Sequence, residues 1–402
     1  MRRATISMGA ALLVVLAGCG GGDDDAVGGD GNGADGGGGG GGGDGGSYPG
    51  DGDDLDTASG CAGVFNPDQM LEYHFEVQNW STVQNDCTFE EYVEADMQCG
   101  DGPTIRVGMR HKRSGSAAKP GFKIDVNQYA DAQAFNSLKK MSFENGISSS
   151  TECGGGDSGD PGAPLSEYLA WRIHVLGGHV TSRAALARVF VNGDEIGIYV
   201  NVEQPDKVFL EKRLGDNDGW LWKFSGGVSD GLKTNEGTTD PYDAWFCFFK
   251  KNGCEPPADG VLETELPQKL DIDQLLRVGA ANALMANHDA ILLKLNNYYY
   301  YDRDSGPRMY FPWDLDTTMR DDYDVFTGSV SGGTTVFTDV LFSHWEDDYD
   351  AILTEWLAGP LSLEAITGEI DRAVDLAGGD GDSLEAWWND RHAAVSEQVD
   401  AH

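Results

Sequence analysis

Five polar side chains, arranged around two short aromatic segments, are of the types that bind metal ions and accept protons. They are Asp289, Asn296, Asn297, Asp314 and Asp316. The aromatic segments 298–301 and 309–311 flank a Gly306-Pro307 turn, which predicts a β-hairpin. Because the two outer ends of a hairpin lie side by side, we expect these polar groups to converge at one end of the sheet.

Such a convergence of oxygen atoms favours chemistry with divalent cations and phosphates. Carboxylate and amide oxygens are hard ligands suited to Mg²⁺ or Ca²⁺. Phosphoryl transfer uses one carboxylate to take the hydroxyl proton, and an amide with a further carboxylate to hold the metal on the phosphates. A plainer interpretation is also open, in which Asp289 ends a helix, and Asp314 and Asp316 form a hydrogen-bonded turn beside Trp313.

The N-terminus has the parts of a bacterial lipoprotein signal in the right order. Arg2 and Arg3 give the positive start, residues 10–16 the apolar run, and Leu16-Ala17-Gly18-Cys19 a cleavage site that resembles a lipobox. We expect residues 1–18 to be removed and Cys19 to be lipidated; the alternative is a plain secretory peptide with an incidental cysteine. The predicted location is extracytoplasmic, lipid-anchored to a bacterial membrane at the periplasm or cell surface.

Residues 19–60 are predicted to be the lipidated cysteine and a disordered tether. Residues 20–60 hold 20 glycines and 10 aspartates, so they cannot bury enough apolar surface to offset the entropy of ordering. Residues 61–402 are long enough for one large α+β unit or for two lobes. The net charge of −39 argues against a nucleic-acid partner, because the protein would repel phosphate backbones.

Six cysteines follow Cys19, and an even number in an exported chain predicts up to three disulfides. The pairs closest in sequence, Cys87–Cys99 and Cys247–Cys254, are the simplest choice, and they leave Cys61 with Cys153. Fifteen pairings are formally possible for six cysteines. No Cys-x-x-Cys spacing occurs among them, which argues against redox or zinc chemistry.

The order of the expected elements indicates an α+β fold. Strands are predicted at 71–77, 104–112, 122–126, 187–191, 196–202 and 220–224, and helices at 165–176, 208–213, 272–287 and in most of the chain after 339. The Asn192-Gly193 pair predicts a tight hairpin turn. Few strands alternate with helices at βαβ spacing, which disfavours a doubly wound parallel sheet.

Collinear motifs over roughly 65–318 resemble the spore coat protein H (CotH) family of secreted or surface-attached proteins. The strongest matches are Asp289, Asn297 and the Pro-Trp-Asp-Leu-Asp run at 312–316. Weaker matches are 107–112, 119–123, 138–145, Glu167, 191–193, 197–199, Glu203, Gly219, Leu221 and Lys223. The resemblance implies a divergent two-lobed protein-kinase fold, with a β-rich N-lobe of about 61–205 and a helical C-lobe of about 206–402 that carries the catalytic hairpin.

The resemblance also implies ATP and Mg²⁺ (or Mn²⁺) as cofactors. Asp289 would orient the acceptor hydroxyl or take its proton, and Asn297 and Asp314 would hold the metal with help from Asp316.

For the nucleotide, the resemblance implies that Lys123 would hold phosphate oxygens and be positioned by Glu167. Glu203 would line the nucleotide pocket beside Lys112 and Lys223. Lys123, Glu167 and Glu203 each have a plainer alternative interpretation. These are a solvated strand lysine for Lys123, a surface glutamate for Glu167 and a cap of the next helix for Glu203.

Together these features predict a monomeric atypical protein kinase that transfers the γ-phosphoryl group of ATP to hydroxyls of a cell-envelope or surface protein. A non-catalytic binding module of the same fold is the first alternative. A calcium-dependent carbohydrate binder, using exposed aromatics and Asp-rich loops, is a second.

Replacing Cys19 with Ser should release the protein into the soluble exported fraction, because the acyl chains on that residue are the predicted membrane attachment. Immunoblots of membrane and soluble fractions measure the effect. A mutant that stays in the membrane fraction would place the anchor elsewhere.

Overall fold

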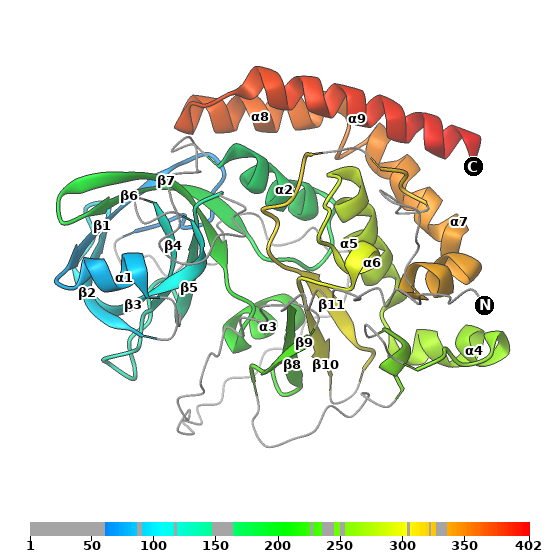
Figure 1. Cartoon of the computed structure of the whole chain (residues 1–402), viewed down its shortest axis with the longest axis horizontal. Helices are drawn as coiled ribbons and strands as arrows, with labels where there is room; N and C mark the ends of the chain where they lie inside the picture. Colours follow the sequence, from blue (N-terminus) through cyan, green and yellow to red (C-terminus); the bar gives the residue numbers. More distant parts are fainter. Residues whose placement is uncertain are drawn as a thin grey trace, which may run out of the picture.

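The computed structural model describes residues 61–86, 91–115, 119–146, 164–225, 228–234, 245–249, 254–303, 306–320, 323–326 and 336–402. A closed seven-stranded barrel forms the N-terminal part, and a four-stranded sheet with helices packed on it forms the rest (Figure 1). The predicted α+β class is therefore confirmed. The closed barrel was not predicted, and the two-lobed kinase arrangement stays a prediction.

The barrel has the strand order β1-β2-β3-β4-β5-β7-β6. Its strands are β1 (Leu71–Val77), β2 (Val93–Cys99), β3 (Ile105–Gly115), β4 (Pro120–Asp125), β5 (Lys140–Glu144), β6 (Ala184–Val191) and β7 (Asp194–Glu203), and helix α1 (Trp80–Asn85) packs beside them. Neighbours are antiparallel except where β1 meets β6 in parallel and closes the cylinder. At that seam the Asn192 side chain accepts from Val77 N at 2.7 Å and donates to Val77 O at 3.0 Å.

Alternation of buried residues along each strand fills the barrel with side chains. On β1 the buried positions are Tyr73, Phe75 and Val77. Phe75 and Phe143 meet edge-to-face at 5.9 Å, as do Tyr73 and Phe143 at 5.1 Å. Such aromatic packing leaves the interior a core, so any ligand site of this barrel must lie on its outer face or at its ends.

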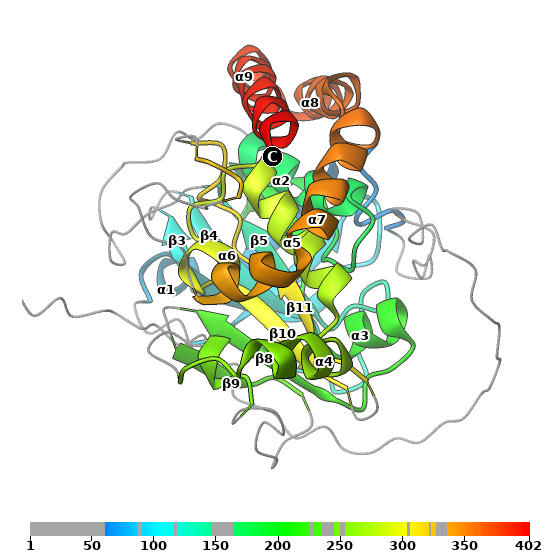
Figure 2. The ribbon, with the colours of Figure 1, turned by 90° about the vertical axis from the view of Figure 1, so that its right-hand side faces the viewer.

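The second sheet has the order β11-β10-β8-β9. Its strands are β8 (Trp220–Ser225), β9 (Val228–Leu232), β10 (Tyr298–Asp302) and β11 (Met309–Pro312). The remaining helices are α2 (Leu165–Leu176), α3 (Lys207–Leu214), the 3₁₀ turn η2 (Cys247–Phe249), α4 (Asp259–Lys269), α5 (Ile272–Leu284), α6 (Ile291–Lys294), α7 (Val336–Ala358), α8 (Leu363–Ala377) and α9 (Gly381–Ala401). Figure 2 shows α5 and α7 above this sheet, with α8 and α9 beyond them.

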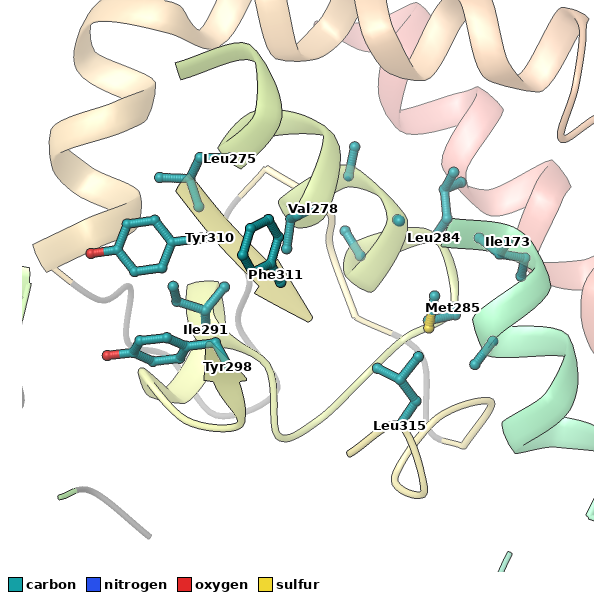
Figure 3. Close-up of a cluster of buried hydrophobic side chains, with 14 of the residues drawn as sticks. Ile173, Leu275, Val278, Leu284, Met285, Ile291, Tyr298, Tyr310, Phe311 and Leu315 are labelled. Atoms are coloured by element: carbon teal, nitrogen blue, oxygen red, sulfur yellow. The ribbon is translucent and has the colours of Figure 1, made fainter. Parts of the chain in front are cut away.

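The largest core lies between α5 and the hairpin β10–β11. Leu275 and Val278 of α5 point toward Tyr310 and Phe311 of β11, and Tyr298 lies beside them (Figure 3). The same core continues onto the outer faces of β6 and β7. Those two strands therefore have one face in each core, which joins the barrel firmly to the helical part.

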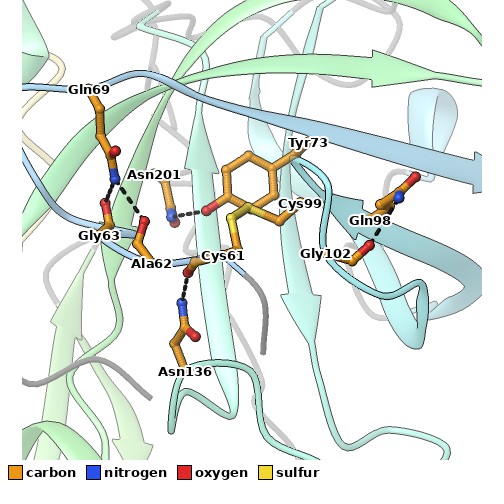
Figure 4. The surroundings of a disulfide bond; sticks show 10 residues. All are labelled: Cys61, Ala62, Gly63, Gln69, Tyr73, Gln98, Cys99, Gly102, Asn136 and Asn201. Atoms are coloured by element: carbon orange, nitrogen blue, oxygen red, sulfur yellow. Dashed lines mark hydrogen bonds between the residues drawn. A yellow bond between two sulfur atoms is a disulfide. The ribbon is translucent and has the colours of Figure 1, made fainter. Parts of the chain in front are cut away.

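The structure changes two of the three predicted disulfides. Cys247–Cys254 is confirmed, with Cα atoms 5.4 Å apart. Cys61 bonds Cys99, not Cys153, and ties the first described residue to the end of β2 (Figure 4). The predicted pairs Cys87–Cys99 and Cys61–Cys153 are thus wrong, because two cysteines far apart in sequence meet at the end of the barrel; Cys87 and Cys153 themselves lie outside the described residues.

Helix boundaries agree with the sequence in one case and differ in another. The helix predicted at 165–176 is α2, Leu165–Leu176. The helix predicted at 272–287 ends at Leu284, since Ala286 takes a left-handed backbone with φ of 49°. Among the described helices, none is both long enough and apolar enough to cross a membrane.

Replacing Cys61 and Cys99 together with Ser should lower the free energy of unfolding by about 4 kcal/mol, because their bond spans 38 residues. The matched control replaces Cys247 and Cys254, which are 7 residues apart, and should cost about 2 kcal/mol. Urea unfolding of both variants under non-reducing conditions gives the two values. A larger loss in the control would contradict the loop-length argument.

Candidate active site

The hairpin β10–β11 brings the predicted amide and carboxylates to one end of the sheet. Tyr298 pairs with Pro312, and just outside this pair Trp313 N donates to Asn297 O at 3.2 Å. Asn297 and the next residue after Trp313, Asp314, both have left-handed backbones, with φ of 53° and 57°. Asn and Asp adopt this backbone region more readily than other residues besides glycine, and it recurs at turns and functional sites. The convergence predicted from the sequence is therefore what the hairpin produces.

Asp289 joins this end of the sheet from the loop after α5. Its Oδ2 accepts from Asn297 Nδ2 at 2.9 Å and from Asn296 Nδ2 at 3.0 Å, and Lys294 Nζ lies 3.6 Å from its Oδ1. The side chains of Asp289 and Asp314 remain 26% and 36% exposed. Both carboxylates are thus held in place and still open to a ligand from solvent.

The outer face of the barrel supplies the opposite wall. Lys112 of β3 contacts the Glu144 carboxylate of β5, and its Nζ lies 3.7 Å from Asp314 Oδ1. The same oxygen of Glu144, Oε1, also accepts from the Ser142 hydroxyl at 2.7 Å. Lys112 therefore links the barrel to the hairpin, and it does so at the boundary between the two sheets.

Trp313 packs at this boundary between two lysines. The Nζ atoms of Lys112 and Lys223 lie 5.3 and 5.8 Å from its ring centroids. Trp171 of α2 and Tyr299 of β10 meet the same indole edge-to-face at 6.1 and 5.3 Å. Helix α2, the barrel and the hairpin thus share one aromatic contact, which fixes the cations relative to the carboxylates.

Burial and crowding set the protonation of these groups. Burial raises the pKa of Glu167 well above its usual value, and the Glu144 and Asp316 carboxylates raise it further. Burial and the Asp314 carboxylate likewise raise the pKa of Asp316. Burial would lower the pKa of Lys112, but Glu144, Asp314 and Glu167 outweigh it and raise that pKa. Like charges in low dielectric oppose ionisation, so burial and the neighbouring carboxylates favour the protonated forms of Glu167 and Asp316.

The donor set fits a divalent cation. Glu167 Oε2 is buried without a hydrogen-bond partner, and the carboxylates and amide nearby offer only hard oxygen ligands. In the part of the chain that the structure describes, no three His, Cys, Asp or Glu side chains already stand in metal-binding geometry. Asn297, Asp314 and Asp316 are the residues that would hold such a cation.

Other predicted residues take several positions. Lys123 of β4 is buried and lies opposite Ser142, on the same outer face as Glu144, while its pairing with Glu167 stays a prediction. Glu203 is also buried, and both of its oxygens accept from Arg183.

The Glu203 carboxylate also accepts a hydrogen bond from Arg213 Nη2 at 2.7 Å. Helix α3 is capped by Asp206, which accepts from Val208 N and Phe209 N, so the capping alternative for Glu203 is wrong. Its place in a nucleotide pocket stays a prediction.

Sequence reasoning missed Glu144 as a site residue. The segment 140–144 (KMSFE) alternates polar and apolar residues, which is the signal of a half-buried strand with Ser142 and Glu144 on one face. The segment is only five residues long, so the pattern is weak. The polar face of β5 can be recognised as part of the site only after β5 is seen to pair with β4.

Comparison with known proteins identifies the class. A family model described as CotH kinase protein matches residues 114–379, and the chain belongs to this family. The description of this family names a kinase, and kinases in general use a nucleotide and a divalent metal. Among solved structures the chain is similar to the Helicobacter pylori proinflammatory kinase CtkA, with 14% identity and a TM-score of 0.37, over 66% of this chain and 91% of that one. No curated protein matches the chain.

Replacing Lys112 with Met should lower the free energy of unfolding by about 3–5 kcal/mol, because Glu144 and its neighbours lose a buried counter-charge. Adding Glu144→Gln to that variant should recover part of the loss. Thermal and urea unfolding at neutral pH measure both. If the double variant is less stable than the single one by the full cost of Glu144→Gln alone, the two groups do not act as a pair.

Proposed function

We propose that this protein transfers the γ-phosphoryl group of ATP to a hydroxyl of a protein substrate. The observation that carries the proposal is the position of Lys112, with Glu144 on one side and Asp314 3.7 Å away on the other. A lysine ammonium beside a carboxylate that is 36% exposed is an arrangement that can hold phosphates and a metal together. Membership of the CotH kinase family supports the same class of reaction.

The proposed roles fall into two groups: residues that act on the nucleotide and its metal, and residues that act on the acceptor hydroxyl. On the nucleotide side, Asn297, Asp314 and Asp316 hold the divalent cation, which when bound neutralises charge on the phosphates. Four further residues serve the nucleotide or its orientation: Lys112, Lys123, Glu167 and Lys223. Glu203 sets the wall of the nucleotide pocket through its arginine contacts.

On the acceptor side, Asp289 orients the substrate hydroxyl or takes its proton. The amides of Asn296 and Asn297 hold one oxygen of this carboxylate, which leaves the other directed to Lys294 and solvent. Because Asn297 serves both Asp289 and the proposed cation, it would set the distance between the proton acceptor and the metal.

The proposed setting is extracytoplasmic, with the chain lipid-anchored to a bacterial membrane at the periplasm or the cell surface. Cys19 would carry the acyl chains, residues 20–60 would act as the tether, and the substrate would be a protein of the cell envelope. The chain would work as a monomer.

Asp289→Asn should cut phosphoryl transfer by about 10²–10⁴-fold and leave binding of Mg²⁺ and nucleotide nearly unchanged, because Asp289 acts on the acceptor. Asp314→Asn should instead weaken Mg²⁺-dependent nucleotide binding. Calorimetry measures binding, and radiolabel transfer from ATP to the protein itself and to a generic acidic protein measures turnover, with Mg²⁺ and then Mn²⁺.

The matched control is Asp273→Asn on α5, whose side chain is 70% exposed and pairs with Arg277. It should change neither binding nor transfer. Binding without any transfer by the unmodified protein would favour the non-catalytic binding module. Absence of nucleotide binding would remove the kinase proposal altogether.

A further inference from the structure

Asn287 lies between α5 and Asp289 and is fully buried. Its Oδ1 accepts two hydrogen bonds, from Asp289 N at 2.9 Å and from Thr317 Oγ1 at 3.1 Å. Its Nδ2 donates to Asn282 Oδ1 at 2.8 Å, one turn back in α5. The single atom Asn287 Oδ1 therefore accepts hydrogen bonds both from Asp289, the proposed acceptor-side residue, and from Thr317, the residue directly after Asp316.

Backbone contacts reinforce the same link. His288 N donates to Thr317 O at 3.2 Å, and Met319 N donates to Met285 O at 2.8 Å. The loop that carries Asp289 thus runs beside the loop that follows Asp316, without being part of a sheet. Tyr323 adds a side-chain contact to the first of these loops, since its hydroxyl lies 3.1 Å from Asn282 O and 3.3 Å from Asn287 O.

Helix α9 holds the ends of both loops through the Arg391 side chain. Arg391 is buried and donates to Ala283 O at 2.6 Å, to Leu284 O at 3.2 Å and to Tyr323 O at 2.7 Å. These carbonyls end α5 and begin the segment after the second loop. The two loops can therefore shift relative to each other only by breaking several buried hydrogen bonds.

We propose that Asn287 is a positioning residue, which sets the Asp289 carboxylate relative to Asp314 and Asp316 through its shared Oδ1. This inference rests on the proposed function. The two loops carry opposite halves of the proposed reaction, and the Asn287 side chain joins them while it also fixes the backbone of Asp289. Misplacement of a reacting group by about 1 Å can cost about 10²-fold in rate.

The first experiment is a double-mutant cycle of Asn287→Ala and Asp289→Asn in the full chain. Asn287→Ala alone should lower kcat about 10²-fold, with the Kd of Mg²⁺ and nucleotide within about threefold of the unmodified value. If Asn287 acts through Asp289, the double variant should be no slower than Asp289→Asn alone. Multiplying effects, as a general loss of stability would give, overturn the inference.

Thr317 provides a second test that does not touch Asn287. Thr317→Val removes the hydroxyl donor and should lower kcat about tenfold, whereas Thr317→Ser keeps the donor and should restore it. Thr264→Val on α4 is the matched control, because its exposed hydroxyl bonds only the backbone of its own helix. Equal activity of the Val and Ser variants at 317 contradicts the link.

Amide hydrogen exchange over residues 287–291 separates this inference from the proposed function. Loss of the Oδ1 acceptor in Asn287→Ala should speed exchange in this peptide at least tenfold, and Thr264→Val should not. That result supports the link even if no phosphoryl transfer is found, in which case only the proposed reaction fails. Unchanged exchange in Asn287→Ala overturns the inference whether or not the protein is active.

Discussion

The buried ammonium group of Lys112 is the interaction on which the site depends. It lies among the carboxyl groups of Glu144, Glu167, Asp314 and Asp316, which come from the barrel, from α2 and from the residues just after β11. Removing so many charges from water is costly unless an opposite charge lies close by. The lysine is therefore both the electrostatic centre of the site and the reason that three separate elements can meet there.

Rigid surroundings hold that centre in place. Strands β6 and β7 take part in both hydrophobic cores, so the barrel and the helical part cannot move apart without exposing apolar surface. Helix α2 is held from outside by a buried ion pair, in which Arg172 Nε lies 3.0 Å from Glu369 of α8. The left-handed backbones of Asn297 and Asp314 persist because this packing determines them from several directions.

Local signals in the sequence predicted the parts, and long-range contacts decided how they combine. Tyr298–Tyr301 and the turn after it predicted the hairpin, and Asn192-Gly193 predicted the turn between β6 and β7, because these patterns act over a few residues. Barrel closure was not predictable, since it depends on β1 meeting β6 more than a hundred residues later. The same limit explains the wrong disulfide partners of Cys61 and Cys99 and the missed role of Glu144, whose meaning depends on Lys112 from another strand.

The disulfide between Cys61 and Cys99 also determines how the domain would bear mechanical load. A pulling force applied to the chain ahead of Cys61 passes through the two sulfur atoms to the end of β2 and bypasses residues 62–98. Strand β1, which closes the barrel against β6, lies inside the bypassed loop and carries no tension. The barrel would therefore resist being unzipped from its N-terminal strand, because β2 up to Cys99 is bypassed as well, and the load would enter the main chain again at Cys99 and pass on toward β3.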